Sequence, residues 1–131
     1  FSFILFDVDH FKGINDTYGH WFGDVVLKNI AEVVMLEMRK QDVLARYGGE
    51  EFAVMLPYTD FSGANILAER VRQSVSESTH TKGEHTAGVT ISLGVASVPK
   101  DKLESVEDLI VCADSRLYKA KKSGRNQSVF E

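Results

Sequence analysis

The sequence Arg46-Tyr47-Gly48-Gly49-Glu50-Glu51-Phe52 joins two short apolar runs, residues 43–47 and 52–56. Two β-like runs joined by Gly-Gly predict a β-hairpin, because glycine adopts positive φ angles without a steric penalty. Two acids directly after the glycines crowd like charges into a tight turn, which favours a bound cation. The glycines also leave bare backbone that a ligand can approach closely. This turn is therefore the first candidate for a ligand site.

The composition is that of a single globular domain. The chain has 131 residues, of which 44% are apolar and 26% are charged. A net charge of −4 argues against a nucleic-acid surface, and the single Cys112 allows no internal disulfide, which favours the reducing cytoplasm. No apolar run is long enough to span a membrane, so we expect no membrane contact by this domain itself. The chain begins at Phe1 inside an apolar run, so we expect it to be part of a longer protein that could be membrane-anchored.

The chain reads as strands alternating with helices. Residues 3–6 form an apolar run that ends in Asp7-Val8-Asp9, which predicts a strand buried on both faces with acids at its carboxyl end. Two stretches carry apolar residues at helical spacing, which predicts two amphipathic helices, the first beginning near residue 23. Their apolar positions are Leu27, Ile30, Ala31, Val34 and Met38, and then Ala64, Leu67, Ala68, Val71 and Val75.

The remaining segments complete an α/β sandwich. Residues 10–20 are dense in polar and small residues and suggest one helical turn, and residues 76–88 predict a surface loop. Alternation over residues 89–96 predicts a strand; a helix capped by Ser105 follows, and residues 128–130 read as an edge strand. This order predicts a mostly antiparallel central sheet of about five strands covered by helices.

The acids at the end of the first strand and in the hairpin form a candidate metal site. If the hairpin lies beside the first strand, Asp7 and Glu50 meet at one edge of the sheet. Carboxylates with one or two backbone oxygens suit Mg²⁺, which prefers few protein ligands together with substrate phosphates. The alternative is that Asp7 and Asp9 are simply strand-end acids that face solvent.

Two further groups of side chains have both a functional and a structural interpretation. Basic residues gather near Gly124, where they could neutralise phosphates or simply complement a helix dipole. They are Lys119, Lys121, Lys122 and Arg125. An amide and a carboxylate, Asn15 and Asp24, could read the edge of a guanine, or could be a turn residue and an acid at a helix N-terminus.

Four motifs occur in a fixed order and carry a family resemblance. They are Asp7-Val8-Asp9-His10-Phe11-Lys12-x-Ile14-Asn15-Asp16-x-x-Gly19-His20-x-x-Gly23-Asp24-x-x-Leu27, Arg46-Tyr47-Gly48-Gly49-Glu50-Glu51-Phe52, Ile91-Ser92-Leu93-Gly94-Val95 and Ala113-Asp114-x-x-Leu117-Tyr118-x-Ala120-Lys121-x-x-Gly124-Arg125-Asn126. Together they resemble the GGDEF family of diguanylate cyclases, in its GGEEF variant. The resemblance spans nearly the whole chain, and it is the ordered set, rather than any one motif, that makes it specific.

The resemblance implies a nucleotidyl-cyclase-like, ferredoxin-like palm fold that condenses two GTP molecules into cyclic di-GMP and releases two pyrophosphates. It implies two Mg²⁺ ions, with Mn²⁺ as an alternative, held by Asp7, Glu50 and the Val8 carbonyl, with Glu50 and Glu51 as the catalytic acids. Asn15 and Asp24 would bind guanine. The phosphates would be bound by His10, Phe11, Lys12, Gly48, Gly49, Lys121 and Arg125. Because each chain has one nucleotide site, the resemblance also implies that a homodimer is needed for catalysis.

The segment Arg39-Lys40-Gln41-Asp42 fits the family's Arg-x-x-Asp inhibitory motif, which binds the product cyclic di-GMP, often with an arginine of the next helix, here Arg70. The alternative is a surface Arg and Asp at a helix end. The family's usual Asp-x-Leu-Thr-Gly-Leu-x-Asn-Arg segment before the first strand is absent from these residues, as is any sensor domain. We therefore expect residues 1–131 to be one catalytic domain without its N-terminal helix.

A second hypothesis is a module that kept the fold but acts as a receptor for cyclic di-GMP or GTP. Degenerate receptors of this family usually lose the hairpin glycines or the metal-binding acids. All of them are present here, which favours the enzyme: Asp7, Gly48, Gly49, Glu50 and Glu51.

Overall fold

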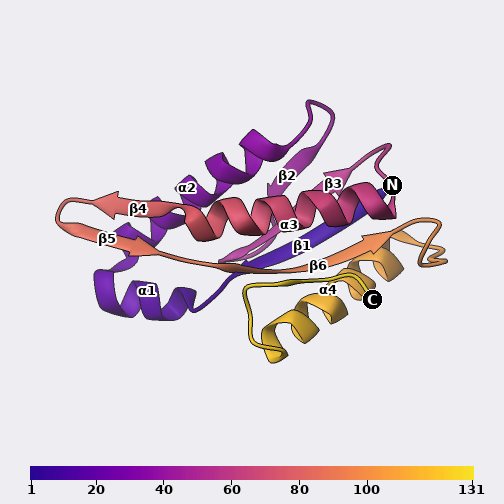
Figure 1. Cartoon of the computed structure of the whole chain (residues 1–131). Helices are drawn as coiled ribbons and strands as arrows, with labels where there is room; N and C mark the ends of the chain where they lie inside the picture. The colour runs from indigo at the N-terminus through magenta and orange to yellow at the C-terminus, as the bar shows by residue number, and fades with distance from the viewer.

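The computed structural model describes residues 1–131 and is built on a five-stranded sheet in the order β2-β3-β1-β6-β7 (Figure 1). The pairings are antiparallel except that of β6 with β7, which is parallel. The sheet therefore matches the expected α/β sandwich with a mostly antiparallel sheet. Its strands are β1 (Ser2–Val8), β2 (Val43–Arg46), β3 (Glu51–Leu56), β6 (Ile91–Ser97) and β7 (Ser128–Val129).

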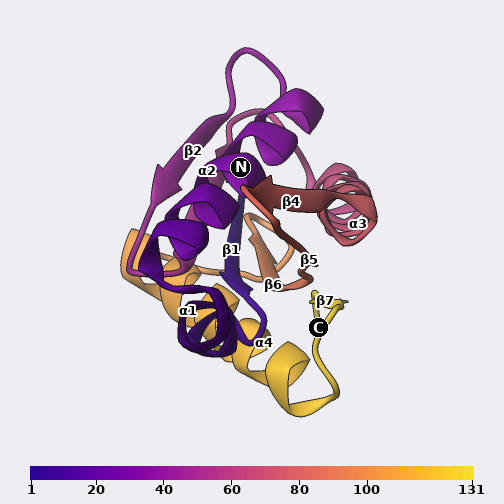
Figure 2. The same cartoon turned by 90° about the vertical axis from the view of Figure 1, so that its left-hand side faces the viewer.

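Helices cover both faces of the sheet. The larger core lies between the sheet and the pair α2 (His20–Glu37) and α3 (Phe61–Glu77). The smaller core lies under α4 (Val106–Lys122), which Figures 1 and 2 show on the other side of the sheet. Alternate residues of β1 serve the two cores, so this central strand is buried on both faces, as its continuous apolar run predicts.

Two segments are more regular than the sequence predicts. Residues 11–18 form the helix α1 (Phe11–Tyr18) and α2 begins directly after it, because Phe11 is buried and its neighbours pack on the larger core. The expected loop over residues 76–88 contains the end of α3 and then a separate hairpin of β4 (Thr79–Lys82) and β5 (His85–Gly88). Only His80 is buried among the residues of β4, so the hairpin lacks the apolar alternation that marks a strand.

Local capping fixes several helix ends. The Ser105 side chain accepts a hydrogen bond from the Asp108 N–H (3.1 Å), as the capping pattern predicts, and Asp60 caps α3 in the same way. Gly124, at φ 116°, ends α4, and the Arg125 N–H donates to the Ala120 carbonyl (2.9 Å). None of the helices is both long enough and apolar enough to cross a bilayer.

Candidate active site

The end of β1 and the β2–β3 turn lie side by side, as the sequence predicts. Asp7 pairs with Glu51 across the β1–β3 ladder. One residue further on, the Val8 N–H donates to the Glu50 carbonyl (3.2 Å). The fold therefore brings the acids of the first strand and of the hairpin to one edge of the sheet.

The Asp7 carboxylate is buried but only half satisfied. Its side chain is 9% exposed, and Oδ2 pairs with the Lys121 ammonium in the last turn of α4. The other oxygen, Oδ1, is buried and has no hydrogen-bond partner. A buried carboxylate oxygen without a donor is unfavourable, and a bound cation would satisfy it.

The two glutamates feel the charge of Asp7. Burial, and then the negative charge of Asp7, raise the pKa of Glu50 above its ordinary value, while Lys121 opposes the shift. The pKa of Glu51 is raised by the same two causes, in the same order. One ammonium thus compensates three neighbouring carboxylates incompletely, and a divalent cation would relieve the remaining repulsion.

The candidate metal ligands of the protein would surround an ion only in part. No three His, Cys, Asp or Glu side chains are placed to hold an ion on their own. Two carboxylates and a backbone carbonyl are what Mg²⁺ accepts when phosphates and waters complete its octahedron. The orphaned Asp7 oxygen and the repelling glutamates therefore fit a magnesium ion that arrives with a phosphorylated substrate.

A cavity of about 180 Å³ joins the predicted metal and phosphate residues. It is lined by Asp7, Val8, Asp9, His10, Phe11, Lys12, Glu50, Lys121 and Arg125. Three of these residues, His10, Phe11 and Lys12, belong to the N-terminal end of α1. The N-terminal end of a helix presents free N–H groups and positive partial charge. Lys12 pairs with Asp16 on the exposed face of α1, whereas Arg125 forms no ion pair.

The hairpin turn differs in detail from the prediction. Positive φ angles occur at Gly19, Gly83 and Gly124 but not at the two glycines of the turn. The turn is instead closed by the Tyr47 and Gly48 N–H groups, which both donate to the Glu51 carbonyl (2.7 and 3.0 Å).

The space beside Gly49 is open. A side chain added at Gly49 would meet no atom within 4 Å, so this stretch of backbone is free to approach a ligand. The Arg46 guanidinium spans the turn by donating to the carbonyls of Gly48 and Gly49 (3.2 and 2.6 Å). Sequence reasoning missed this bracing role, and the only sign of it was an arginine directly before the turn.

The guanine candidates gather where α1 meets α2. Gly23 allows the contact, because a Cβ there would lie 1.9 Å from Asn15 Oδ1. That amide oxygen is buried and unpaired, and Asp24 follows Gly23 on α2. Asp24 also lines a cavity of about 370 Å³ with Arg46 and Phe52, so this end of α2 faces the hairpin.

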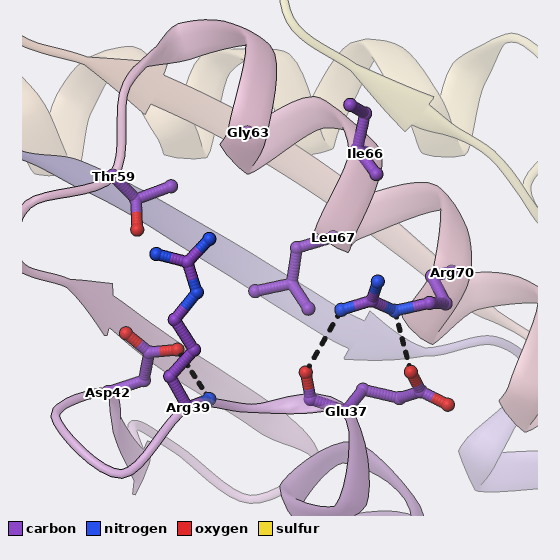
Figure 3. Close-up of a pocket in the computed structure, with 8 residues that line it drawn as sticks. All are labelled: Glu37, Arg39, Asp42, Thr59, Gly63, Ile66, Leu67 and Arg70. Atoms are coloured by element: carbon purple, nitrogen blue, oxygen red, sulfur yellow. Dashed lines mark hydrogen bonds and ion pairs between the residues drawn. The ribbon is translucent and has the colours of Figure 1, made fainter.

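A second pocket, of about 150 Å³, brings together the three residues of the expected inhibitory site (Figure 3). Asp42 Oδ2 accepts from the Arg39 N–H (2.8 Å), and Asp42 Oδ1 is buried without a partner. Arg70 pairs with Glu37 (2.6 Å), and in Figure 3 Leu67 lies between the two arginines. The pocket therefore presents two cations and an unsatisfied carboxylate around an apolar floor.

Asp9 is a site residue to which sequence reasoning gave no role. It is 5% exposed, and its carboxylate accepts from the hydroxyls of Thr90 and Ser92 (2.7 Å each) and from the Asn126 N–H (3.0 Å). Unlike Asp7, it is fully satisfied by the protein. Asp7, at the end of β1, and Asp9, just after it, therefore differ in whether the protein satisfies their carboxylates.

Comparison with known proteins agrees with this geometry. The family model described as "Diguanylate cyclase, GGDEF domain" matches residues 1–127. The chain is 47% identical over 126 residues to diguanylate cyclase A of Treponema denticola, and 42% identical over 129 residues to diguanylate cyclase VdcA of Vibrio cholerae. Each alignment covers 96% of this chain but only 34% and 38% of the relative, so the chain spans about a third of the length of these proteins.

Solved structures give the same result. The active GGEEF domain of a diguanylate cyclase from Vibrio cholerae superimposes with a TM-score of 0.90 at 35% identity, over 98% of this chain and 81% of that one. The GGDEF domain of DgcB from Caulobacter crescentus, solved in complex with c-di-GMP, superimposes with a TM-score of 0.90 at 34% identity, over 98% and 76%. The chain belongs to the GGDEF family of diguanylate cyclase domains.

Proposed function

We propose that this domain condenses two GTP molecules into cyclic di-GMP and two pyrophosphates. The observation that carries the proposal is the single cavity in which Asp7 and Glu50 face Lys121 and Arg125. Carboxylates on one side and cations on the other are what a magnesium triphosphate requires. Because GTP is an intracellular nucleotide, we place the reaction in the cytoplasm.

The carboxylates of Asp7 and Glu50 and the Val8 carbonyl would hold two Mg²⁺ ions, or Mn²⁺ in their place. When bound, these ions supply Lewis acidity toward the 3′-hydroxyl and the triphosphate. The unpaired Asp7 Oδ1 is the atom whose environment improves most on metal binding. Glu51, opposite Asp7 in the ladder, supports the site through its negative charge.

Glu50 would accept the proton of the 3′-hydroxyl, directly or through a water molecule. The 3′-oxygen attacks the α-phosphorus of the other GTP in line, a new phosphodiester bond forms and pyrophosphate leaves. Lys121 and Arg125, with backbone groups near His10, Phe11 and Lys12, neutralise the leaving pyrophosphate. A second attack in the opposite sense closes the ring.

Asn15 and Asp24 would select guanine. A carboxylate accepts from N1–H and the 2-amino group of guanine together, and adenine lacks that pair of donors. Asn15 Oδ1 is buried without a hydrogen-bond partner, and a donor from guanine would satisfy it. Gly48 and Gly49 would bring the turn's bare backbone close to the nucleotide. Since one chain supplies one such site, two chains must face each other, and we expect activity to require a homodimer.

The pocket of Arg39, Asp42 and Arg70 would bind the product and inhibit turnover. Arginine stacks on guanine bases and binds phosphate through a planar fork, so two arginines suit a cyclic dinucleotide. Arg70 would exchange its pairing with Glu37 for the ligand. Asp42 Oδ1, which lacks a partner, would accept from a guanine edge.

The test is chromatographic analysis of the products formed from GTP and Mg²⁺ by the chain, dimerised through a fused coiled coil. The Glu50→Gln variant keeps the size of the side chain and removes its charge. We expect cyclic di-GMP from the native chain and none above background from the variant. Binding of cyclic di-GMP without any turnover would contradict the enzyme proposal and favour a receptor.

A further inference from the structure

The loop after α4 holds two consecutive residues in a disfavoured backbone conformation. Arg125 and Asn126 have φ angles of 64° and 47°, in the left-handed region, which asparagine tolerates but arginine seldom adopts. Such residues persist there only where the surroundings hold them in place. Arg125 lines the cavity that also contains Asp7, and it forms none of the ion pairs of the fold. The strained loop therefore presents an uncommitted cation to the candidate active site.

Asp9 braces this loop from the side of the sheet. Its Oδ2 accepts from the Asn126 N–H (3.0 Å), which belongs to the peptide joining Arg125 to Asn126. A fixed N–H fixes the rotation of that peptide, and hence the direction in which the chain carries Arg125. Hydrogen bonds from Thr90 and Ser92 (2.7 Å each) hold the Asp9 carboxylate itself in place.

Helix α3 braces the same loop from the other side. The Arg72 guanidinium donates to Asn126 Oδ1 (3.0 Å) and pairs with Glu69 Oε2 (3.0 Å). The second Glu69 oxygen accepts from the Ser128 hydroxyl (2.7 Å). Asn126 is thus held through its backbone by Asp9, just after β1, and through its side chain by Arg72 of α3.

We propose, on the basis of the function proposed above, that Asp9 and Arg72 are positioning residues that hold Arg125 toward the phosphates of GTP. Once either brace is removed, the loop relaxes toward negative φ and turns Arg125 away from the cavity. A purely structural Asp9, which only ties β1 to β6, would change the stability of the domain and leave its affinity for nucleotide unaltered.

The experiment measures calorimetric binding of 3′-deoxyGTP with Mg²⁺, which tests affinity without turnover. Arg125→Ala is the reference variant for the loss of affinity. Because it removes one charge-assisted phosphate contact, it should weaken binding about tenfold or more. We expect Asp9→Asn and Arg72→Ala each to weaken binding to a similar extent. We also expect neither to weaken it further in the Arg125→Ala background, because coupled residues are not additive. Native affinity in both single variants, or losses that multiply with that of Arg125→Ala, would overturn the proposal.

Asp101→Asn is the matched control. Asp101 is also a buried carboxylate held by several hydrogen bonds, from Arg116 and the Ser97 N–H, but it lies outside the cavity lining. We expect its variant to bind the nucleotide with native affinity. Arg72 is half-buried on α3 and lies outside the two apolar cores, so Arg72→Ala carries the test even where Asp9→Asn fails to fold.

NMR separates this proposal from the function on which it rests. The Cα and Cβ chemical shifts of Arg125 and Asn126 report left-handed backbone directly. Loss of that signature in Asp9→Asn and Arg72→Ala supports the braces, and its retention in both contradicts them. If Arg125→Ala binds nucleotide normally, the phosphate role of Arg125 fails, whatever the shifts show.

Discussion

Gly94→Ala tests the closest helix–sheet contact in the fold. A Cβ at this position on β6 would lie 2.0 Å from the Ala113 carbonyl oxygen and 2.4 Å from the Leu117 nitrogen, both in the backbone of α4. Ordinary contacts begin at 3.4 Å, so α4 would have to move away by about 1.4 Å. Backbone atoms cannot rotate away as a side chain would, so we expect a loss at the upper end of the usual range for overpacking, about 3 kcal/mol.

The same displacement should reach the active site, because α4 carries Lys121, the partner of Asp7. A misplacement of about 1 Å is enough to lower turnover about 100-fold. Urea unfolding followed by circular dichroism gives the free energy of unfolding, and pyrophosphate release by a dimerised chain gives the rate.

Gly13→Ala is the matched control for stability. A Cβ at Gly13 on α1 would meet no atom within 4 Å, so we expect a gain of about 0.5 kcal/mol from the lower entropy of the unfolded chain. A Gly94→Ala variant within about 0.5 kcal/mol of the native chain and with native turnover would refute the reasoning, because overpacking at a rigid contact has to exceed that figure.

Three further predictions follow from the charges. Since burial and Asp7 raise the pKa of Glu50, ionised Glu50 destabilises the metal-free fold as pH rises through and above the ordinary value of 4.5. Urea titrations in EDTA should therefore show that Glu50→Gln is more stable than the native chain at pH 7. This difference in the free energy of unfolding should narrow toward pH 4 and also when Mg²⁺ is added. Arg116→Ala leaves the half-buried Asp101 carboxylate with the Ser97 N–H as its remaining donor. It should lower the free energy of unfolding at pH 7 by about 2 kcal/mol. The loss should be smaller below the ordinary pKa of 3.8, since Arg116 holds the pKa of Asp101 below that value; an equal loss at all pH values would contradict this. Asp42→Ala should weaken product inhibition: the concentration of cyclic di-GMP needed to halve the initial rate should rise about tenfold or more, while turnover without product is kept. An unchanged inhibition constant would exclude the Arg-x-x-Asp pocket as the inhibitory site.

The sequence was enough to predict the parts of the fold that have a continuous or regularly spaced apolar pattern. The run before Asp7 and the two runs around the Gly-Gly turn are apolar over several residues and became β1, β2 and β3. Because antiparallel neighbours place their ends together, the meeting of Asp7 with Glu50 also followed from the order of elements. The convergence of Arg39, Asp42 and Arg70 was expected only from the family resemblance, and the pocket in Figure 3 shows that the fold brings them together.

Segments without a period were predicted poorly. The hairpin of β4 and β5 buries one polar residue, His80. The only local feature of the sequence that indicates a turn there is Gly83, which has a φ angle of 61° and lies between two runs that contain threonine. Helix α1 contains Gly13 and Asn15, which disfavour helix, and forms because tertiary packing of Phe11 outweighs that preference. The role of Asp9 depended on three donors distant in sequence, which no local pattern records.

On the proposed function, two chains, each holding one GTP, make one cyclic dinucleotide. The most direct measurement is the molar ratio of pyrophosphate to cyclic di-GMP formed by the isolated chain with GTP and Mg²⁺ over a range of chain concentrations. We predict two pyrophosphates for each cyclic di-GMP, with a rate per chain that rises with chain concentration until the dimer saturates. Pyrophosphate or phosphate release without cyclic di-GMP, or a rate per chain independent of concentration in a monomeric sample, would contradict it.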